Sequence, residues 1–437
     1  MASSGAAAVV RKQRALSLLF WTLFSVPIIV WSCQMAGISL SSDTIWLTES
    51  MRRILGGGRL GTDVYELNPP LDMFTYTLPW FAAQTLHLPF HYAVFAWTLS
   101  LTVISAAIVH AILRGWTFLE RSDASGVTAT LIVANTIICS TSFGERDQYV
   151  GLALIPFTLL QAALTFNLPR PRRMTWPVFA IGSLFILLKP DHGLVPAIML
   201  AFRAVRQKRL PLRDPDFVCL AVSTTAYIAA TWLLFPAFPH DILPDVMKLY
   251  VPLRAPHILR KTLGWLAATL VLLLVTGWTN MPRERKVMTL MLEAAALLSL
   301  IPYFVQGRGF YYHLFPLFSF AACALGLLLP WLMRRDMQAK HTLFASIAIL
   351  TGFAWIFVPP VKGYPLHAEY KNLSVPSLVN SVCGEKPDCT FFMFSNNMGI
   401  VHETAYYTGH EHASRFASFW FVPWLVTQQD MIARGLP

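Results

Sequence analysis

The chain has 437 residues, of which 55% are hydrophobic and only 13% are charged. A soluble globular protein has roughly 25% charged residues, so this composition excludes a disordered chain, a fibre and an ordinary cytosolic enzyme. The 34 Lys and Arg residues exceed the 23 Asp and Glu residues, which gives a net charge of +11 at pH 7. Together with 30 Phe and 14 Trp, these values predict an α-helical polytopic membrane protein.

Apolar segments recur along the chain at the length of a membrane-spanning helix, which is roughly 20 residues. We predict about eleven transmembrane helices, at 15–37, 91–113, 125–142, 149–166, 174–188, 192–205, 217–236, 262–279, 287–305, 313–333 and 341–359. The first segment lacks the small-residue cleavage site of a signal peptide, so we interpret it as a retained helix.

Lys and Arg gather in alternate short loops, for example at 203–213 and 283–286. Because basic loops stay in the cytoplasm, this pattern predicts a cytoplasmic N-terminus. The positive charge is therefore interpreted as a topology signal, and no nucleic-acid partner is expected.

The opposite, outer side then carries the loop 38–90, the segment 237–261 and a tail. We divide the chain into a membrane module, 1–359, and a small outer domain, 360–437. A strand-like run at 390–394 predicts that this domain is α/β.

Two cysteines, Cys383 and Cys389, lie close together in the predicted outer tail. Short spacing and an oxidising compartment favour a disulfide between them.

The outer loop contains acids at points where the backbone changes direction. Asp43 begins an amphipathic stretch, 42–55, that is typical of an interfacial helix with Ser42 or Asp43 as its N-cap. After a glycine triplet come Asp63 and Glu66, followed by Asn68-Pro69-Pro70, which forces extended backbone. A second interfacial helix is expected at 71–86.

Acidic side chains beside a bilayer are costly unless they are solvated or used. We interpret Asp43 and Glu66 as functional, and Glu49 and Asp72 as solvated surface acids.

This order of features resembles the GT-C glycosyltransferases, polytopic enzymes that use polyprenyl-phosphate sugars and include protein O-mannosyltransferases and aminoarabinose transferases. Asp43 matches the catalytic acid near the end of their first helix, and Glu66 with Pro69-Pro70 matches a later acidic element. The stretches 144–148, 187–190 and 306–316 are also similar. Thr44 stands where several of these families have a second acid, so a paired-carboxylate site is not expected there.

The resemblance implies an inverting transfer of a sugar from a polyprenyl-phosphate donor to a hydroxyl of a glycan or lipid acceptor at the outer face of a membrane. The expected location is the bacterial inner membrane, with the active site in the periplasm. Such a reaction needs a carboxylate base and positive charge at the departing phosphate. Asp43 and Glu66 are the candidate catalytic residues. The candidate substrate-binding residues are Asp63, Asn68, Glu145, Arg146, Lys189, Arg308, Tyr311, Tyr312 and His313. A divalent cation is left open as a cofactor.

Two alternatives come from other classes of protein. The interruption Lys189-Pro190-Asp191 between two short spans favours a secondary transporter, although the chain lacks the two similar halves typical of that class. The other alternative is a non-catalytic lipid-glycan flippase or scaffold.

Overall fold

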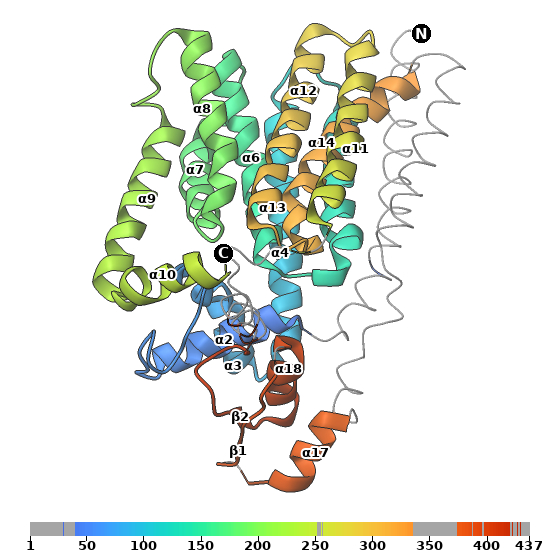
Figure 1. The fold of residues 1–437 in the computed structure, drawn as a ribbon. Helices are drawn as coiled ribbons and strands as arrows, with labels where there is room; N and C mark the ends of the chain where they lie inside the picture. Colours follow the sequence, from blue (N-terminus) through green and yellow to red (C-terminus); the bar gives the residue numbers. More distant parts are fainter. Residues whose placement is uncertain are drawn as a thin grey trace.

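The computed structural model describes residues 40–250, 257–334 and 374–419 except 387 and 396, together with the single residues 29, 255, 422, 426 and 429. Its described part is a bundle of long helices with a smaller group of elements across one end (Figure 1). The α-helices are α2 Ser42–Leu55, α3 Thr77–Leu86, α4 Phe90–Arg114, α5 Arg121–Val133, α6 Arg146–Phe166, α7 Arg172–Ile186, α8 Leu194–Gln207, α9 Pro215–Leu234, α10 Leu243–Asp245, α11 Ile258–Trp278, α12 Arg283–Leu298, α13 Leu300–Gln306, α14 Phe315–Arg334, α17 Ser374–Cys383 and α18 Met398–Thr408. Short 3₁₀ or π turns are η1 Pro70–Tyr76, η2 Ala134–Ile138, η3 Ser140–Ser142, η4 Pro190–Gly193, η5 Phe238–Ile242, η6 Val246–Tyr250 and η7 Tyr311–Leu314.

Within the described ranges, six helical segments are long and apolar enough to cross a membrane. They are Phe90–Arg114, Arg146–Phe166, Pro215–Leu234, Ile258–Trp278, Arg283–Gln306 and Tyr311–Leu332.

The predicted count of eleven is not confirmed within the described residues, for two reasons. The spans predicted at 15–37 and 341–359 lie outside the described residues. Of the others, α7 and α8 are only 15 and 14 residues long, and a 15-residue helix is roughly 22 Å long, shorter than the roughly 30 Å hydrocarbon core. The helix α5 has 13 residues and continues directly into the π turn η2.

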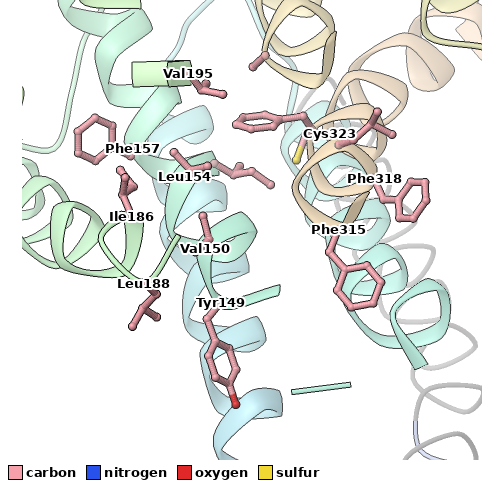
Figure 2. Close-up of a cluster of buried hydrophobic side chains, with 14 of the residues drawn as sticks. Tyr149, Val150, Leu154, Phe157, Ile186, Leu188, Val195, Phe315, Phe318 and Cys323 are labelled. Carbon is pink, nitrogen blue, oxygen red and sulfur yellow. The ribbon is translucent and has the colours of Figure 1, made fainter. Parts of the chain in front are cut away.

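The helix α6 forms the centre of the bundle. It packs against α4, α7, α8 and α14, and nearly all of its side chains are buried. Figure 2 shows Val150, Leu154 and Phe157 of α6 within the same apolar cluster as Ile186 of α7 and Phe315 of α14. The helices α9 and α11 are mostly exposed apolar surface, as expected for helices that face lipid.

The helices α5 and α14 approach each other closely at a glycine. A Cβ atom added to Gly326 would lie 2.5 Å from the Cα of Val127, so only glycine fits there. This is the small-residue packing that is common between membrane helices.

Buried ion pairs hold the end of the bundle opposite the outer loop. Arg203 of α8 contacts Asp216 of α9 at 2.7 Å, and Arg285 of α12 contacts Asp123 of α5 at 2.6 Å. Arg203 and Arg285, which the sequence placed among loop charges, therefore lie buried within helices and link neighbouring elements.

The outer loop begins with α2, as predicted, but its N-cap is Ser41 rather than Ser42 or Asp43. The Ser41 side chain accepts a hydrogen bond from the backbone N–H of Thr44 at 3.2 Å. The predicted second helix at 71–86 is divided into η1 and α3. Residues 44–48 of α2 are buried, and α18 of the tail packs against this helix.

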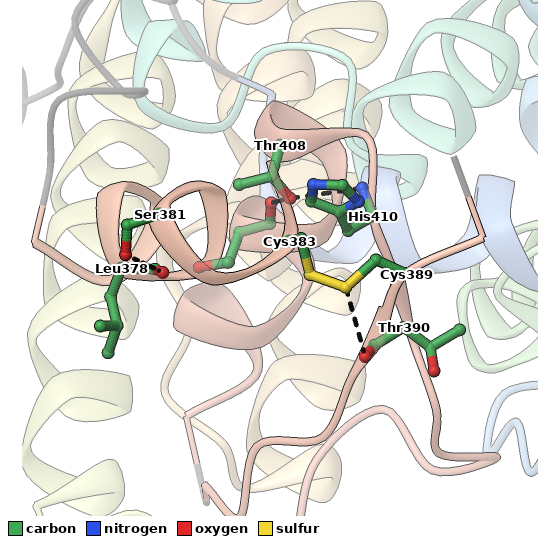
Figure 3. The surroundings of a disulfide bond; sticks show 8 residues. Leu378, Ser381, Cys383, Cys389, Thr390, Thr408 and His410 are labelled. Atoms are coloured by element: carbon green, nitrogen blue, oxygen red, sulfur yellow. Dashed lines mark hydrogen bonds between the residues drawn. A yellow bond between two sulfur atoms is a disulfide. The ribbon is translucent and has the colours of Figure 1, made fainter. Parts of the chain in front are cut away.

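The described tail contains α17, α18 and two very short parallel strands, β1 Thr390–Phe391 and β2 Glu411–His412. The predicted strand at 390–394 is thus only two residues long. A disulfide joins Cys383, at the end of α17, to Cys389, just before β1, with Cα atoms 5.6 Å apart (Figure 3). The tail lies beneath α2 and α3, at the end of the bundle that carries the loop 38–90 (Figure 1).

Candidate active site

Charged side chains gather where α6 begins, between the helix bundle and the outer loop. Glu145 precedes the helix, and Arg146 and Asp147 form its first turn. All three are at most 2% exposed. Since buried charges are rare unless they are paired or used, this is the candidate functional site.

The Arg146 guanidinium lies between two carboxylates of the outer loop. One nitrogen contacts Asp72 of η1, and the other lies 3.6 Å from an oxygen of Asp43 on α2. Burial raises the pKa of Asp72 to about 7, although Arg146 opposes this shift. The arginine thus joins three elements that are distant in the sequence.

Asp43 is the carboxylate of this cluster that keeps contact with solvent, since its side chain is 20% exposed. The Tyr312 hydroxyl donates a hydrogen bond to it at 3.0 Å. This contact orients the carboxylate and leaves part of it accessible to a ligand.

Glu145 lies close to Asp43 and is hydrogen-bonded by the hydroxyl of Ser41. Burial first, and then the charge of Asp43, raise the pKa of Glu145 to about 8.

A second group surrounds Asp147. Lys189 lies 3.8 Å from this carboxylate, and a ring nitrogen of His192 lies 3.4 Å from its other oxygen. His313 interacts electrostatically with the same carboxylate. The break between α7 and α8 therefore brings a lysine and a histidine to the start of α6.

Glu66 is 2% exposed, and both of its oxygens are hydrogen-bonded. One oxygen accepts from the indole N–H of Trp46, and the other accepts from the backbone and side-chain N–H groups of Asn68 at 2.7 and 2.5 Å. Burial raises the pKa of Glu66, and these donors and Arg146 act against that rise.

The structure thus brings together most of the residues singled out in the sequence: Asp43, Glu66, Asn68, Glu145, Arg146, Lys189, Tyr312 and His313. Three others make different contacts. Asp63 is exposed and accepts from the backbone N–H of Arg59 at 2.7 Å. The Tyr311 hydroxyl donates to the carbonyl of Ile138 at 3.4 Å.

Arg308, the third, lies in the loop between α13 and α14. That loop is held to the segment before α11 by the Ala255 N–H, which donates to the Gly307 carbonyl at 2.7 Å. Its Gly309 lies beside the amino group of Lys261, so two cations, Arg308 and Lys261, belong to this part of the structure.

The interpretation of Asp72 as a solvated surface acid is wrong, because this side chain is fully buried against Arg146. Asp147 and His192 were not selected as site residues. Two sequence features could have identified these acids as site residues. Asp72 closely follows two prolines, and Asp147 is next to Arg146.

Asp43 and Asp72 do not face each other directly, because the Arg146 guanidinium lies between them. Among the described residues, one group of three possible metal ligands has its atoms within 4.8 Å of one another, namely Cys383, Cys389 and His410. Both of its sulfurs are in the disulfide.

The apolar helices and the likeness to solved structures show the fold of this protein. It is an integral membrane protein with the GT-C fold. Two crystal structures of ArnT from Cupriavidus metallidurans share the fold. The one bound to undecaprenyl phosphate is 14% identical with a TM-score of 0.59, over 90% of this chain and 85% of the ArnT chain. The one in the apo state is 13% identical with a TM-score of 0.57, over 91% and 85% of the two chains. No protein-family model and no curated protein matches this chain.

Proposed function

We propose that this protein is a glycosyltransferase that moves a sugar from a polyprenyl-phosphate donor to an acceptor hydroxyl at the outer face of a bacterial inner membrane. One observation carries the proposal: a partly exposed aspartate, Asp43, lies among buried cations where an apolar helix bundle meets its outer loop. A lipid phosphate has the complementary chemistry, with an apolar tail and an anionic head. The related fold of ArnT, which has been crystallised with undecaprenyl phosphate, supports this donor class.

Asp43 is the proposed general base. A hydroxyl is a weak nucleophile until its proton is removed, and a carboxylate within hydrogen-bond reach removes it in the transition state. The hydroxyl of Tyr312 and the guanidinium of Arg146 orient Asp43. Glu66 and Glu145 suit this role less, because both are buried.

In the proposed inverting displacement, the acceptor oxygen attacks the anomeric carbon as Asp43 takes its proton. The bond from that carbon to the phosphate oxygen breaks, and the polyprenyl phosphate leaves as an anion. Lys189 and Arg308 are the proposed partners of this phosphate, and positive charge placed there lowers the barrier.

Donor binding tests the phosphate site. Purified protein in nanodiscs is titrated with a polyprenyl-phosphate sugar. Arg308→Lys should weaken binding although the charge is kept, because only a guanidinium grips phosphate with two parallel hydrogen bonds. Arg308→Ala should weaken it more, and Lys189→Ala should act in the same direction.

Arg209→Ala is the matched control. This arginine is paired with Asp214 and its side chain is 53% exposed, so donor affinity should stay at the wild-type value. Unchanged affinity in the Arg308 and Lys189 variants would move the phosphate site elsewhere.

The alternative of a secondary transporter has less support. Transporters bind their substrate near the membrane midplane between broken helices, whereas the cluster of Asp43, Arg146 and Asp147 lies where α6 begins, between the helix bundle and the outer loop. The interruption at Lys189 contributes to this same cluster.

A further inference from the structure

The C-terminal tail touches the outer loop in two places, both before Glu66 in the sequence. At one place, α18 packs against α2, and the ring of His402 lies 4.7 Å from the ring of Trp46. Both side chains are at most 3% exposed. Burial lowers the pKa of His402 to about 3, so the ring is neutral, and its Nε2 lies 2.5 Å from the carbonyl oxygen of Ala417.

At the other place, the segment 411–417 runs along the loop that precedes Glu66. The backbone N–H of Tyr65 donates to the carbonyl of Arg415 at 2.7 Å. In return, the Arg415 guanidinium donates to the carbonyl of Gly61 at 2.9 Å. These bonds connect the residue next to Glu66 directly to the tail.

A third connection comes from Arg53 of α2. Its guanidinium donates to the carbonyls of Ser414 and His412, each at 2.8 Å, and forms an ion pair with Glu411 at 3.0 Å. The Arg53 side chain is only 15% exposed. Bonds to backbone carbonyls fix the path of the segment 411–417 rather than its side chains.

The tail reaches the candidate site through Trp46. Its indole ring faces His402, while its N–H donates to the Glu66 carboxylate. Glu66 in turn interacts electrostatically with Arg146. Contacts therefore run from the tail to the Glu66 carboxylate, and the charge of Glu66 acts on the guanidinium that lies beside Asp43.

We propose that the tail is a positioning element of the active site, in which His402 and the segment 411–417 fix Trp46 and the loop 61–68, and thereby set the position of the Glu66 carboxylate. This inference rests on the proposed function. Trp46 and His402 are positioning residues, since they act through Glu66 rather than on the substrate. A change far from the reacting atoms that misplaces a side chain of the active site by about 1 Å can lower the rate roughly 100-fold.

Trp46→Phe in the full chain tests the proposal, because it keeps an aromatic ring against His402 and removes the N–H donor to Glu66. We expect kcat to fall roughly 10- to 100-fold while the KM for the donor stays within about twofold. The double variant with Glu66→Gln should be no slower than Glu66→Gln alone, because both changes act at one contact. Trp278→Phe is the matched control, since Trp278 is 87% exposed on α11, and it should keep the wild-type kcat.

His402→Ala acts from the tail and changes no residue of the loop. Hydrogen exchange of the amides at 64–68 should become at least several-fold faster in this variant. Hydrogen exchange needs no transferase activity. If the wild-type protein transfers no sugar, the proposed function fails, but the exchange measurement still shows whether the tail holds the loop. Wild-type kcat in Trp46→Phe, or wild-type exchange at 64–68 in His402→Ala, would overturn the positioning role.

Discussion

Replacement of Arg146 by methionine should destabilise the protein strongly. Arg146 and Asp72 are 3% and 0% exposed at their side chains, so water cannot replace the lost contact. Removal of one partner from a buried ion pair costs about 3–5 kcal/mol. The double variant Arg146→Met with Asp72→Asn should recover most of this loss, because no unpaired carboxyl remains.

The loss should also depend on pH. Burial already raises the pKa of Asp72 to about 7, and without Arg146 it rises further. The folded variant then holds a proton that the unfolded chain releases above about pH 4. Stability is therefore lost as pH rises through this range, and Arg146→Met should be more stable at pH 5 than at pH 7.5.

Reversible unfolding by SDS in mixed micelles measures these differences. Arg209→Met is the control, since its ion pair with Asp214 is on the surface and should contribute about 0–1 kcal/mol. An Arg146→Met protein with wild-type stability, or a double variant less stable than Arg146→Met, would refute the reasoning.

Two further predictions concern the tail. Burial lowers the pKa values of His402 and His412 and raises that of Glu403 to about 7. Below about pH 6.5 both histidines bind a proton more readily in the undocked tail than in the docked one, which weakens docking as pH falls. Glu403 has the opposite effect, but it is one group against two, so docking should weaken overall. Hydrogen exchange of 402–412 at pH 7 and pH 5.5 measures this, and equal protection at both values would contradict it. Cys383 and Cys389 should resist alkylation in denatured, non-reduced protein and both react after reduction; mass spectrometry that finds both alkylated before reduction would argue against the disulfide.

The sequence located α2 and most of the cluster because local signals mark them. Asp43 stands in the first turn of a helix with a clear apolar pattern, and Arg146 lies between two acids at the start of an apolar segment. Their convergence is a tertiary property, since the Arg146 guanidinium meets Asp43 and Asp72 across three elements.

Other features carried no local signal. The sequence around Asp72 is typical of a surface acid, because the arginine that contacts it in the folded protein, Arg146, is distant in the sequence. The contact between Trp46 and His402 joins opposite ends of the chain, so no local pattern predicts it. The short helices α7 and α8 were predicted as spans because hydropathy measures composition, whereas η4 interrupts the helix between them.

Turnover of Asp43→Asn is the measurement that tests the central claim most directly. This change keeps the shape of the side chain and its position beside Tyr312 while it removes the basicity. With a polyprenyl-phosphate sugar donor and purified protein in nanodiscs, kcat should fall by roughly 10²–10⁴-fold while donor affinity stays at the wild-type value. Turnover close to wild type in Asp43→Asn would contradict the account and make Glu66 the next carboxylate to test.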